Sequence, residues 1–100
     1  MGWLICYDIT NDKLRDKISK RIIATGFTRL QYSVFAGDTG EKYFDDMMQQ
    51  LRDLMTNFAL PSDSVLIFDI TDAQMRSCIV LGKDDLDRDA LTGEQHTLIL

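Results

Sequence analysis

A single aspartate, Asp8, ends the apolar run that begins at Trp3. Burying an unpaired charge is costly, so a carboxylate in such a run needs a partner. Mg²⁺ binds one or two carboxylates, keeps several of its waters, and can activate water to hydrolyse a phosphodiester. One aspartate per chain is a poor magnesium site, whereas two copies of Asp8 facing each other across a two-fold axis would form a better one. The alternative is a structural role for Asp8, as a helix cap or one half of a salt bridge.

Basic and hydroxyl side chains follow Asp8 at positions where they could handle a phosphate. Arg15 and Lys17 lie in a basic stretch that we expect to be helical, and Arg29 lies in a later strand-like stretch. Guanidinium and ammonium groups bind phosphate oxygens, and Ser33 could add a hydroxyl. The acid, the basic helix and the mixed strand together indicate a metal ion that faces nucleic acid.

The charge of the chain is unevenly distributed. Residues 1–37 contain six basic and three acidic residues, whereas residues 38–100 contain five basic and 13 acidic residues. The formal net charge of −5 disfavours nucleic acid as a ligand, but a local basic face can still bind phosphates. From charge alone, a solvated helix face explains the same basic residues equally well.

Several other classes of site lack the residues that they need. The sequence contains no Cys/His metal cluster, Ser-His-Asp set, P-loop or dinucleotide fingerprint. Cys6 and Cys78 lie in apolar runs without ligand spacing, which is typical of buried reduced thiols, and His96 is the only histidine. No segment approaches the roughly 18 apolar residues of a membrane span, and the run at residues 3–7 is too short for a signal peptide. We therefore expect a cytoplasmic protein.

Hydrophobic periodicity and turn residues predict strands and two helices. Leu14, Ile18 and Ile22 recur at four-residue intervals before Gly26, which predicts a helix over residues 12–25. The other expected elements are a strand at 3–9, a strand at 28–35, a helix at 40–57 with a capping box at Asp38–Glu41, strands at 65–68 and 78–81, and an acidic loop at 83–95. Together they predict an α+β sandwich, with both helices on one face of a single sheet.

The stretch 28–35 alternates in polarity, which predicts the face to which each side chain points. Leu30, Tyr32 and Val34 should face the helices. The remaining residues should lie on the open face of the sheet: Arg29, Gln31, Ser33 and Phe35. An aromatic residue among polar ones on an open sheet face is a candidate interface.

The sequence ends in the apolar residues 97–100. A strand-like apolar segment should pair with a sheet, either its own or, as we prefer, that of another subunit. We therefore divide the chain into a main domain, residues 1–82, and an acidic loop with a C-terminal strand, residues 83–100, that pairs in a dimer or with a partner.

Three stretches at this spacing resemble the CRISPR-associated Cas2 endonuclease family: Tyr7 to Asp12, Leu14 to Lys17, and Gly26 to Phe35. The resemblance is strong over residues 3–37 and extends through Leu81 by length and element order. It implies a ferredoxin-like homodimer with an antiparallel sheet, joined through the open sheet face, that acts when new spacers are acquired in antiviral defence.

The resemblance also implies roles for individual residues. Asp8 would face its dimer mate and bind a divalent metal, Mg²⁺ or Mn²⁺, as a catalytic residue. The residues implicated in nucleic-acid binding or cleavage are Arg15, Lys17, Arg29, Ser33 and Phe35. Members are described as metal-dependent endonucleases on RNA or double-stranded DNA, and as scaffolds that bridge the Cas1 integrase and protospacer DNA without cutting.

Two features depart from the family pattern. Many relatives carry Glu-Cys or a similar pair after the SVF residues, where this chain has Ala36-Gly37. In addition, residues 28–36 form one segment where a ferredoxin-like fold needs a hairpin, so this segment should be bent or split, or a later strand should take its place. A regulatory module that binds a small ligand is the third hypothesis, supported only by a generic fold and an acidic surface.

Overall fold

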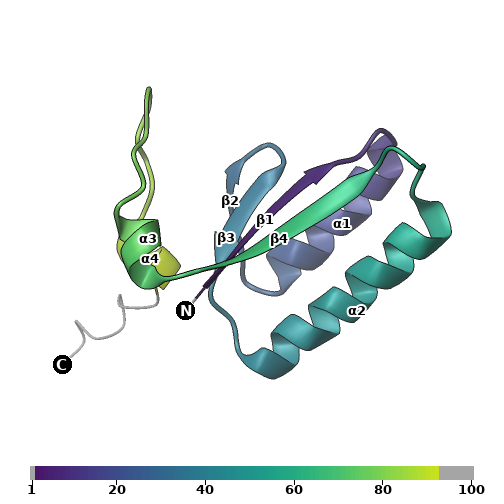
Figure 1. Ribbon diagram of the computed structural model, residues 1–100, viewed down its shortest axis with the longest axis horizontal. Coiled ribbons are helices and arrows are strands. Elements are labelled where there is room, and N and C mark those ends of the chain that lie inside the picture. The colour runs from purple at the N-terminus through teal and green to yellow at the C-terminus, as the bar shows by residue number, and fades with distance from the viewer. Residues whose placement is uncertain (1, 93–100) are drawn as a thin grey trace.

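The structure is a computed structural model that describes residues 2–92 (Figure 1). Its elements follow the ferredoxin-like order and are succeeded by two short helices. They are β1 (Gly2–Asp8), α1 (Asp12–Ala24), β2 (Thr28–Gln31), β3 (Val34–Gly37), α2 (Glu41–Phe58), β4 (Ser64–Ile70), α3 (Asp72–Arg76) and α4 (Arg88–Thr92). The expected strand at residues 97–100 and His96 lie outside the described residues.

The four strands form one antiparallel sheet in the order β2-β3-β1-β4. Helices α1 and α2 lie side by side against one face of this sheet, and the other face carries no long helix (Figure 1). The predicted α+β fold is therefore confirmed. No helix within residues 2–92 combines the length and apolar character needed to cross a membrane.

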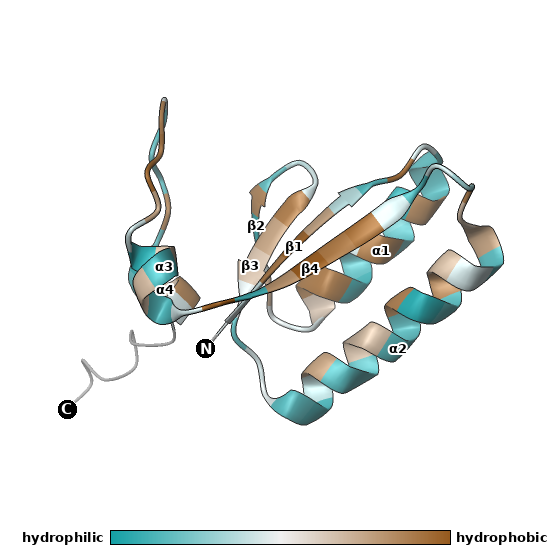
Figure 2. Ribbon diagram, in the orientation of Figure 1, coloured by the Kyte–Doolittle hydropathy of each residue, from teal (hydrophilic) through white to brown (hydrophobic). Residues whose placement is uncertain are grey.

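The main core lies between the sheet and the two long helices. It contains the predicted stripe of α1, since Leu14, Ile18 and Ile22 are all buried. They pack with Ile5 and Tyr7 of β1, Phe35 of β3, and Met47 and Leu51 of α2. Apolar residues also run along β1, β3 and β4 (Figure 2). This core fixes α1, and with it Arg15 and Lys17, relative to the central strand.

Helix α1 begins and ends with the signals that the sequence contains. The Asn11 side chain accepts a hydrogen bond from the Leu14 N–H at 3.0 Å, which caps the first turn. After the last turn, Gly26 has a φ of 101°, a left-handed conformation that favours glycine. The predicted helix is confirmed, with its end at Ala24.

The predicted faces of residues 28–35 are wrong. The segment is split into β2 and β3 by a turn at Tyr32 and Ser33, and Phe35 lies opposite Ile5 in the core with 0% exposure. Leu30 packs instead on a second apolar cluster, formed by Ala36, Met75 and Leu91 on the open side of the sheet. A β-bulge between Arg29 and Gln31 and the tight turn interrupt the two-residue period, so alternation cannot be extrapolated through this segment.

Three further expectations need correction. Residues 78–81 are not a strand but part of an extended arm, residues 77–87, between α3 and α4 (Figure 1). Helix α2 is capped by Gly40 without a side-chain hydrogen bond, so the expected box at Asp38–Glu41 does not form. The expected loop 83–95 contains α4.

The departure at Ala36-Gly37 has a packing explanation. Ala36 is fully buried against Met75 of α3 and Leu91 of α4, where a glutamate would bring a charge into an apolar cluster. A Cβ on Gly37 would lie 3.1 Å from the Phe27 Cα, which is closer than side chains normally pack. The α3–α4 pair and Phe27 thus favour small residues at these positions.

Replacing Phe35 tests its place in the core. Phe35→Ala should lower the free energy of unfolding by about 3–5 kcal/mol, because it empties a fully packed site. Phe58→Ala, at a ring that is 55% exposed on α2, should change it by less than about 1 kcal/mol. Urea unfolding of both variants and the wild type measures the difference, and equal losses would contradict the core assignment.

Candidate functional site

Asp8 lies at the end of the central strand, on the open face of the sheet. Ile5 and Tyr7 of β1 are buried beneath the helices, so the alternating residues Leu4, Cys6 and Asp8 point the other way. Asp8 is exposed, and within residues 2–92 no hydrogen bond or ion pair joins its carboxylate to another residue. Neither a helix cap nor a salt bridge therefore occupies this carboxylate in the described part of the chain, which leaves both oxygens available to a ligand.

Two charged side chains hold the loop that follows Asp8. Arg15 of α1 donates from Nη1 to the carbonyl oxygens of Ile9, at 2.9 Å, and Thr10, at 3.3 Å. From the other side, Asp63 accepts the Thr10 N–H at 3.0 Å. Arg15 also pairs through Nη2 with Asp12. Helix α1 and the α2–β4 loop thus fix the backbone immediately after Asp8.

The hydrogen bonds to Asp63 affect its ionisation. Its second oxygen accepts the Leu60 N–H at 2.8 Å. The N–H groups of Leu60 and then Thr10 stabilise the carboxylate and hold the pKa of Asp63 below the ordinary value of 3.8. The contact between the two loops is therefore strongest when Asp63 is ionised.

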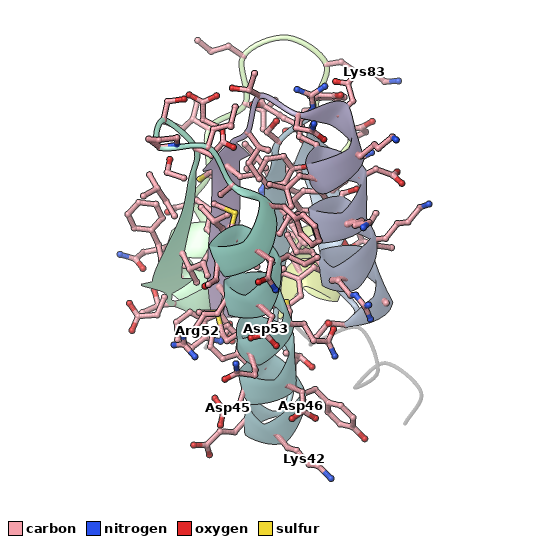
Figure 3. All side chains as sticks on the ribbon, turned by 90° about the vertical axis from the view of Figure 1, so that its right-hand side faces the viewer. Lys42, Asp45, Asp46, Arg52, Asp53 and Lys83 are labelled. Atoms are coloured by element: carbon pink, nitrogen blue, oxygen red, sulfur yellow. The ribbon has the colours of Figure 1, made fainter. Side chains whose placement is uncertain are left out.

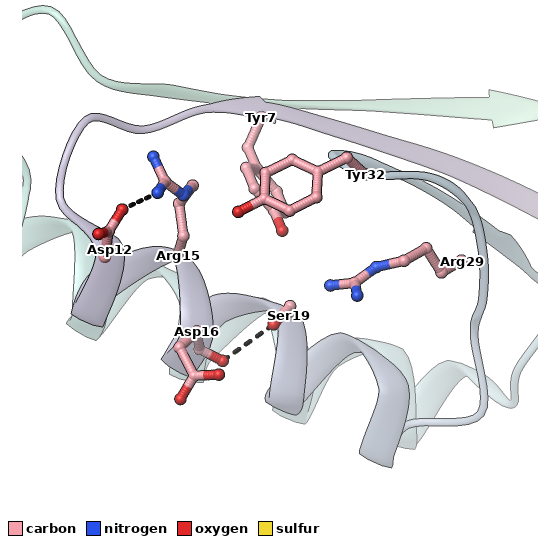
Figure 4. A pocket seen from close by; sticks show the side chains of 7 residues that line it. All are labelled: Tyr7, Asp12, Arg15, Asp16, Ser19, Arg29 and Tyr32. Carbon is pink, nitrogen blue, oxygen red and sulfur yellow. Dashed lines mark hydrogen bonds and ion pairs between the residues drawn. The ribbon is translucent and has the colours of Figure 1, made fainter.

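A recess of about 400 Å³ lies between α1 and the β2–β3 turn (Figure 4). It is lined by Tyr7, Asp12, Arg15, Asp16, Ser19, Arg29 and Tyr32. The Arg29 guanidinium lies 5.0 Å from the centre of the buried Phe35 ring and 5.9 Å from that of Tyr32. These cation–π contacts orient Arg29 without using its N–H donors.

The recess is lined by two basic residues, Arg15 and Arg29, and two acidic ones, Asp12 and Asp16, but their charges are not paired evenly. Its carboxylates have partners, since Asp12 pairs with Arg15, and Asp16 pairs with Lys20 at 2.9 Å. Arg29 has no carboxylate within ion-pair distance in the part of the chain that the structure describes. A phosphate would therefore find donors on Arg29 that no protein acceptor occupies.

The structure brings only some of the sequence-predicted residues together. Arg15 and Arg29 line the recess, whereas Lys17 lies elsewhere on α1, 4.9 Å from the centre of the Phe58 ring. Ser33 is in the β2–β3 turn, where its carbonyl accepts the Tyr7 N–H at 3.1 Å. Phe35 is buried beneath Arg29, so it supports the guanidinium and presents no surface to a ligand.

Sequence reasoning missed two residues near these groups. Tyr32 was assigned to the core by alternation, but its ring is 69% exposed at the edge of the recess. Asp63 follows the helix-breaking residues Pro61 and Ser62, and nothing in its local sequence links it to Thr10, 53 positions earlier. The one sequence signal for Tyr32 was its position, since it is an aromatic residue between two candidate site residues, Arg29 and Ser33.

The donor set at Asp8 fits half of a magnesium site. Carboxylate oxygens are the ligands that Mg²⁺ prefers, and Asp8 offers both of its oxygens to solvent. Residues 2–92 contain no group of three His, Cys, Asp or Glu side chains close enough to share a metal. A second carboxylate would therefore have to come from another copy of the chain.

The open face of the sheet has exposed apolar side chains outside the part that α3 and α4 cover. Leu66 and Phe68 of β4 are 53% and 48% exposed beside β1, and Ile79 and Leu81 on the arm are 85% and 92% exposed. The charged residues of α2, by contrast, project to solvent from the helix layer (Figure 3). A large exposed apolar surface of this kind marks a site of association.

Comparison with known proteins gives consistent results. The family model described as CRISPR associated protein Cas2 matches residues 1–78. The CRISPR-associated endoribonuclease Cas2 2 of Synechocystis sp. is 31% identical over 84 residues, covering 84% of this chain and 87% of that protein. The corresponding endoribonuclease of Korarchaeum cryptofilum is 32% identical over 85 residues, covering 85% and 88%. The crystal structure of Streptococcus pyogenes Cas2 at pH 6.5 has the same fold, with a TM-score of 0.68 at 23% identity, covering 82% of this chain and 100% of that one.

The Asp63 contact predicts a pH dependence of stability. Because the pKa of Asp63 is lowered on folding, its stabilisation is complete above the unfolded pKa near 3.8 and is lost as the pH falls through the lower folded value. Asp63→Asn should therefore be less stable than the wild type at neutral pH, with a difference that shrinks below about pH 4. Chemical unfolding across this range measures the effect. Asp46→Asn, on the exposed face of α2 (Figure 3), is the control, and a pH-independent loss in Asp63→Asn would contradict the assignment.

Proposed function

The chain belongs to the CRISPR-associated Cas2 family, and on this premise we propose that it acts in CRISPR adaptation as a metal-dependent endonuclease in the cytoplasm. The observation that carries the proposal is the exposed Asp8 carboxylate at the end of the central strand, without a protein partner in residues 2–92. The named relatives are endoribonucleases, which favours RNA as the substrate, with double-stranded DNA as the other candidate.

The proposed chemistry is hydrolysis of a phosphodiester. A bound Mg²⁺ or Mn²⁺ would neutralise charge on the phosphate and supply an activated water. Asp8 is the residue that would hold the ion, and the Ser33 hydroxyl in the neighbouring turn is the second proposed catalytic group. Arg29 would bind a phosphate oxygen, while Arg15 orders the loop after Asp8 through its bonds to Ile9 and Thr10. Lys17 would extend the basic surface along α1.

Two copies of the chain are needed to complete the metal site. We propose a homodimer through the open sheet face, in which a two-fold axis brings the two Asp8 carboxylates together. The exposed apolar side chains of Leu66 and Phe68 support this face as the interface. The C-terminal segment 83–100 is proposed to pair within the dimer or with a partner. Facing carboxylates repel each other unless a metal or a proton neutralises them.

A non-catalytic scaffold is the alternative function. In it the dimer would bridge the Cas1 integrase and protospacer DNA. The observation that favours this alternative is that the recess and the Asp8 carboxylate lie on opposite faces of the sheet. Tyr7 points into the recess, while its neighbour Asp8 points the other way. The recess, through Arg29, could then hold nucleic acid without any contribution from Asp8.

Replacing Asp8 distinguishes cutting from scaffolding. Asp8→Asn should reduce metal-dependent cleavage of labelled RNA or duplex DNA by at least about 100-fold, because it removes a metal ligand. Asp45→Asn, an exposed carboxylate on α2 (Figure 3), should cleave like the wild type. If neither the wild type nor Asp8→Asn cleaves, and Asp8→Asn still supports spacer acquisition, the protein is a scaffold and the nuclease proposal is wrong.

The dimer proposal is tested by sedimentation velocity. Phe68→Glu should shift the protein to monomers, because it places charges in the apolar interface, and a chelator should weaken the wild-type dimer. Tyr43→Glu changes an aromatic residue on α2 that is 66% exposed, more than the 48% of Phe68, and should leave the dimer intact. A wild-type monomer, or a Phe68→Glu protein that dimerises as well as the wild type, would contradict the open face as the interface.

A further inference from the structure

The recess between α1 and the β2–β3 turn has features that phosphate binding alone does not require. We propose that it binds one unpaired nucleotide of a single-stranded nucleic acid, with a phosphate on Arg29 and the base stacked on Tyr32. This inference rests on the proposed function, in that it assumes a nucleic-acid ligand, and it adds a base-binding role for Tyr32.

The position of Tyr32 is the first argument. Its ring is 69% exposed at the turn between β2 and β3, and it borders the recess between the side chains of Arg15 and Arg29 (Figure 4). The two guanidinium carbons each lie 5.9 Å from the ring centre. Tyr32 is thereby held beside two cationic groups while much of its surface remains open to a planar ligand. Exposed aromatic rings beside basic groups are the usual platform for unstacked bases.

The state of Arg29 is the second argument. Its guanidinium rests on the fully buried Phe35 ring, which restrains the side chain, and no carboxylate in the described residues pairs with it. Because the Arg29 side chain is restrained but its charge is not paired, several of its N–H donors remain directed toward the recess (Figure 4). A phosphate bound to Arg29 would lie next to Tyr32, because the guanidinium carbon is 5.9 Å from the centre of that ring.

The carboxylates that line the recess do not oppose this ligand. Asp12 is neutralised by Arg15 and Asp16 by Lys20. The buried Ser19 hydroxyl donates to the Asp16 carbonyl at 3.0 Å and leaves its own oxygen as an acceptor facing the recess. The volume of about 400 Å³ falls within the range of pockets that hold small organic ligands.

Geometry distinguishes an unpaired strand from a duplex. In a duplex the faces of each base are covered by its neighbours, so only phosphates and groove edges could reach the recess. A duplex could therefore use Arg29 but could not stack on Tyr32. The contribution of Tyr32 should consequently be confined to single strands, whereas that of Arg29 should be common to both.

Fluorescence anisotropy with labelled single-stranded RNA, single-stranded DNA and duplex DNA of one sequence tests the proposal at a fixed salt concentration. Tyr32→Ala should weaken binding of both single strands by between about 5-fold and 150-fold, the range produced by losing one base–aromatic stack. Duplex affinity should stay within about 2-fold, the level expected when no contact is lost. Tyr32→Phe, which keeps the ring, should restore single-strand binding. Arg29→Gln should weaken all three ligands and reduce the salt slope by about one phosphate contact.

Tyr43→Ala is the matched control, because Tyr43 is 66% exposed on α2, away from the recess. Circular dichroism of each variant checks that it is folded. If Tyr32→Ala leaves single-strand binding unchanged, or weakens duplex binding equally, the stacking site is overturned while the proposed function stands. If the wild type binds none of the three ligands, both proposals fail.

Discussion

The burial of alternate residues of β1 beneath α1 and α2 is the constraint on which the rest of the structure depends. Ile5 and Tyr7 are core residues, and successive side chains of a strand point to opposite faces. Asp8 must therefore emerge on the open face. A shift of one residue in the pairing of β1 would reverse every side chain, which the apolar core prevents. The same packing places Tyr7 in the recess and so separates Arg15 and Arg29, which line the recess, from Asp8 on the opposite face.

Helix α1 connects this core to both candidate sites. Its apolar stripe packs against the sheet, while Arg15 reaches back to the carbonyl groups of the loop after β1. Asp63 holds the same loop from the α2–β4 connection. A basic residue that looks like a free phosphate ligand in the sequence is thus already engaged by the protein, and Arg29, which lies on aromatic rings, keeps its hydrogen-bonding capacity for a ligand.

The two faces of the sheet have different uses in the proposed Cas2 function. The helix-covered face is closed by the core and ends at the recess, where nucleic acid is proposed to bind. The open face has exposed apolar residues on β4 and continues toward the arm. A second copy of the chain on this face would cover the apolar surface and supply the carboxylate that a single chain lacks. Assembly and chemistry would then depend on the same strand.

Much of this architecture could be predicted from the sequence because its signals are local. The spacing of Leu14, Ile18 and Ile22 determines α1 and its buried side, Gly26 ends it, and the run before Asp8 identifies the central strand. The motifs around Asp8 and Arg29 identify the family. The tertiary structure alone decided which face Phe35 occupies, because a bulge and a two-residue turn interrupt the period that alternation relies on. It also decided that Asp63 meets Thr10 and that Tyr32 borders a recess, since both depend on packing between segments far apart in the chain, which no local pattern encodes.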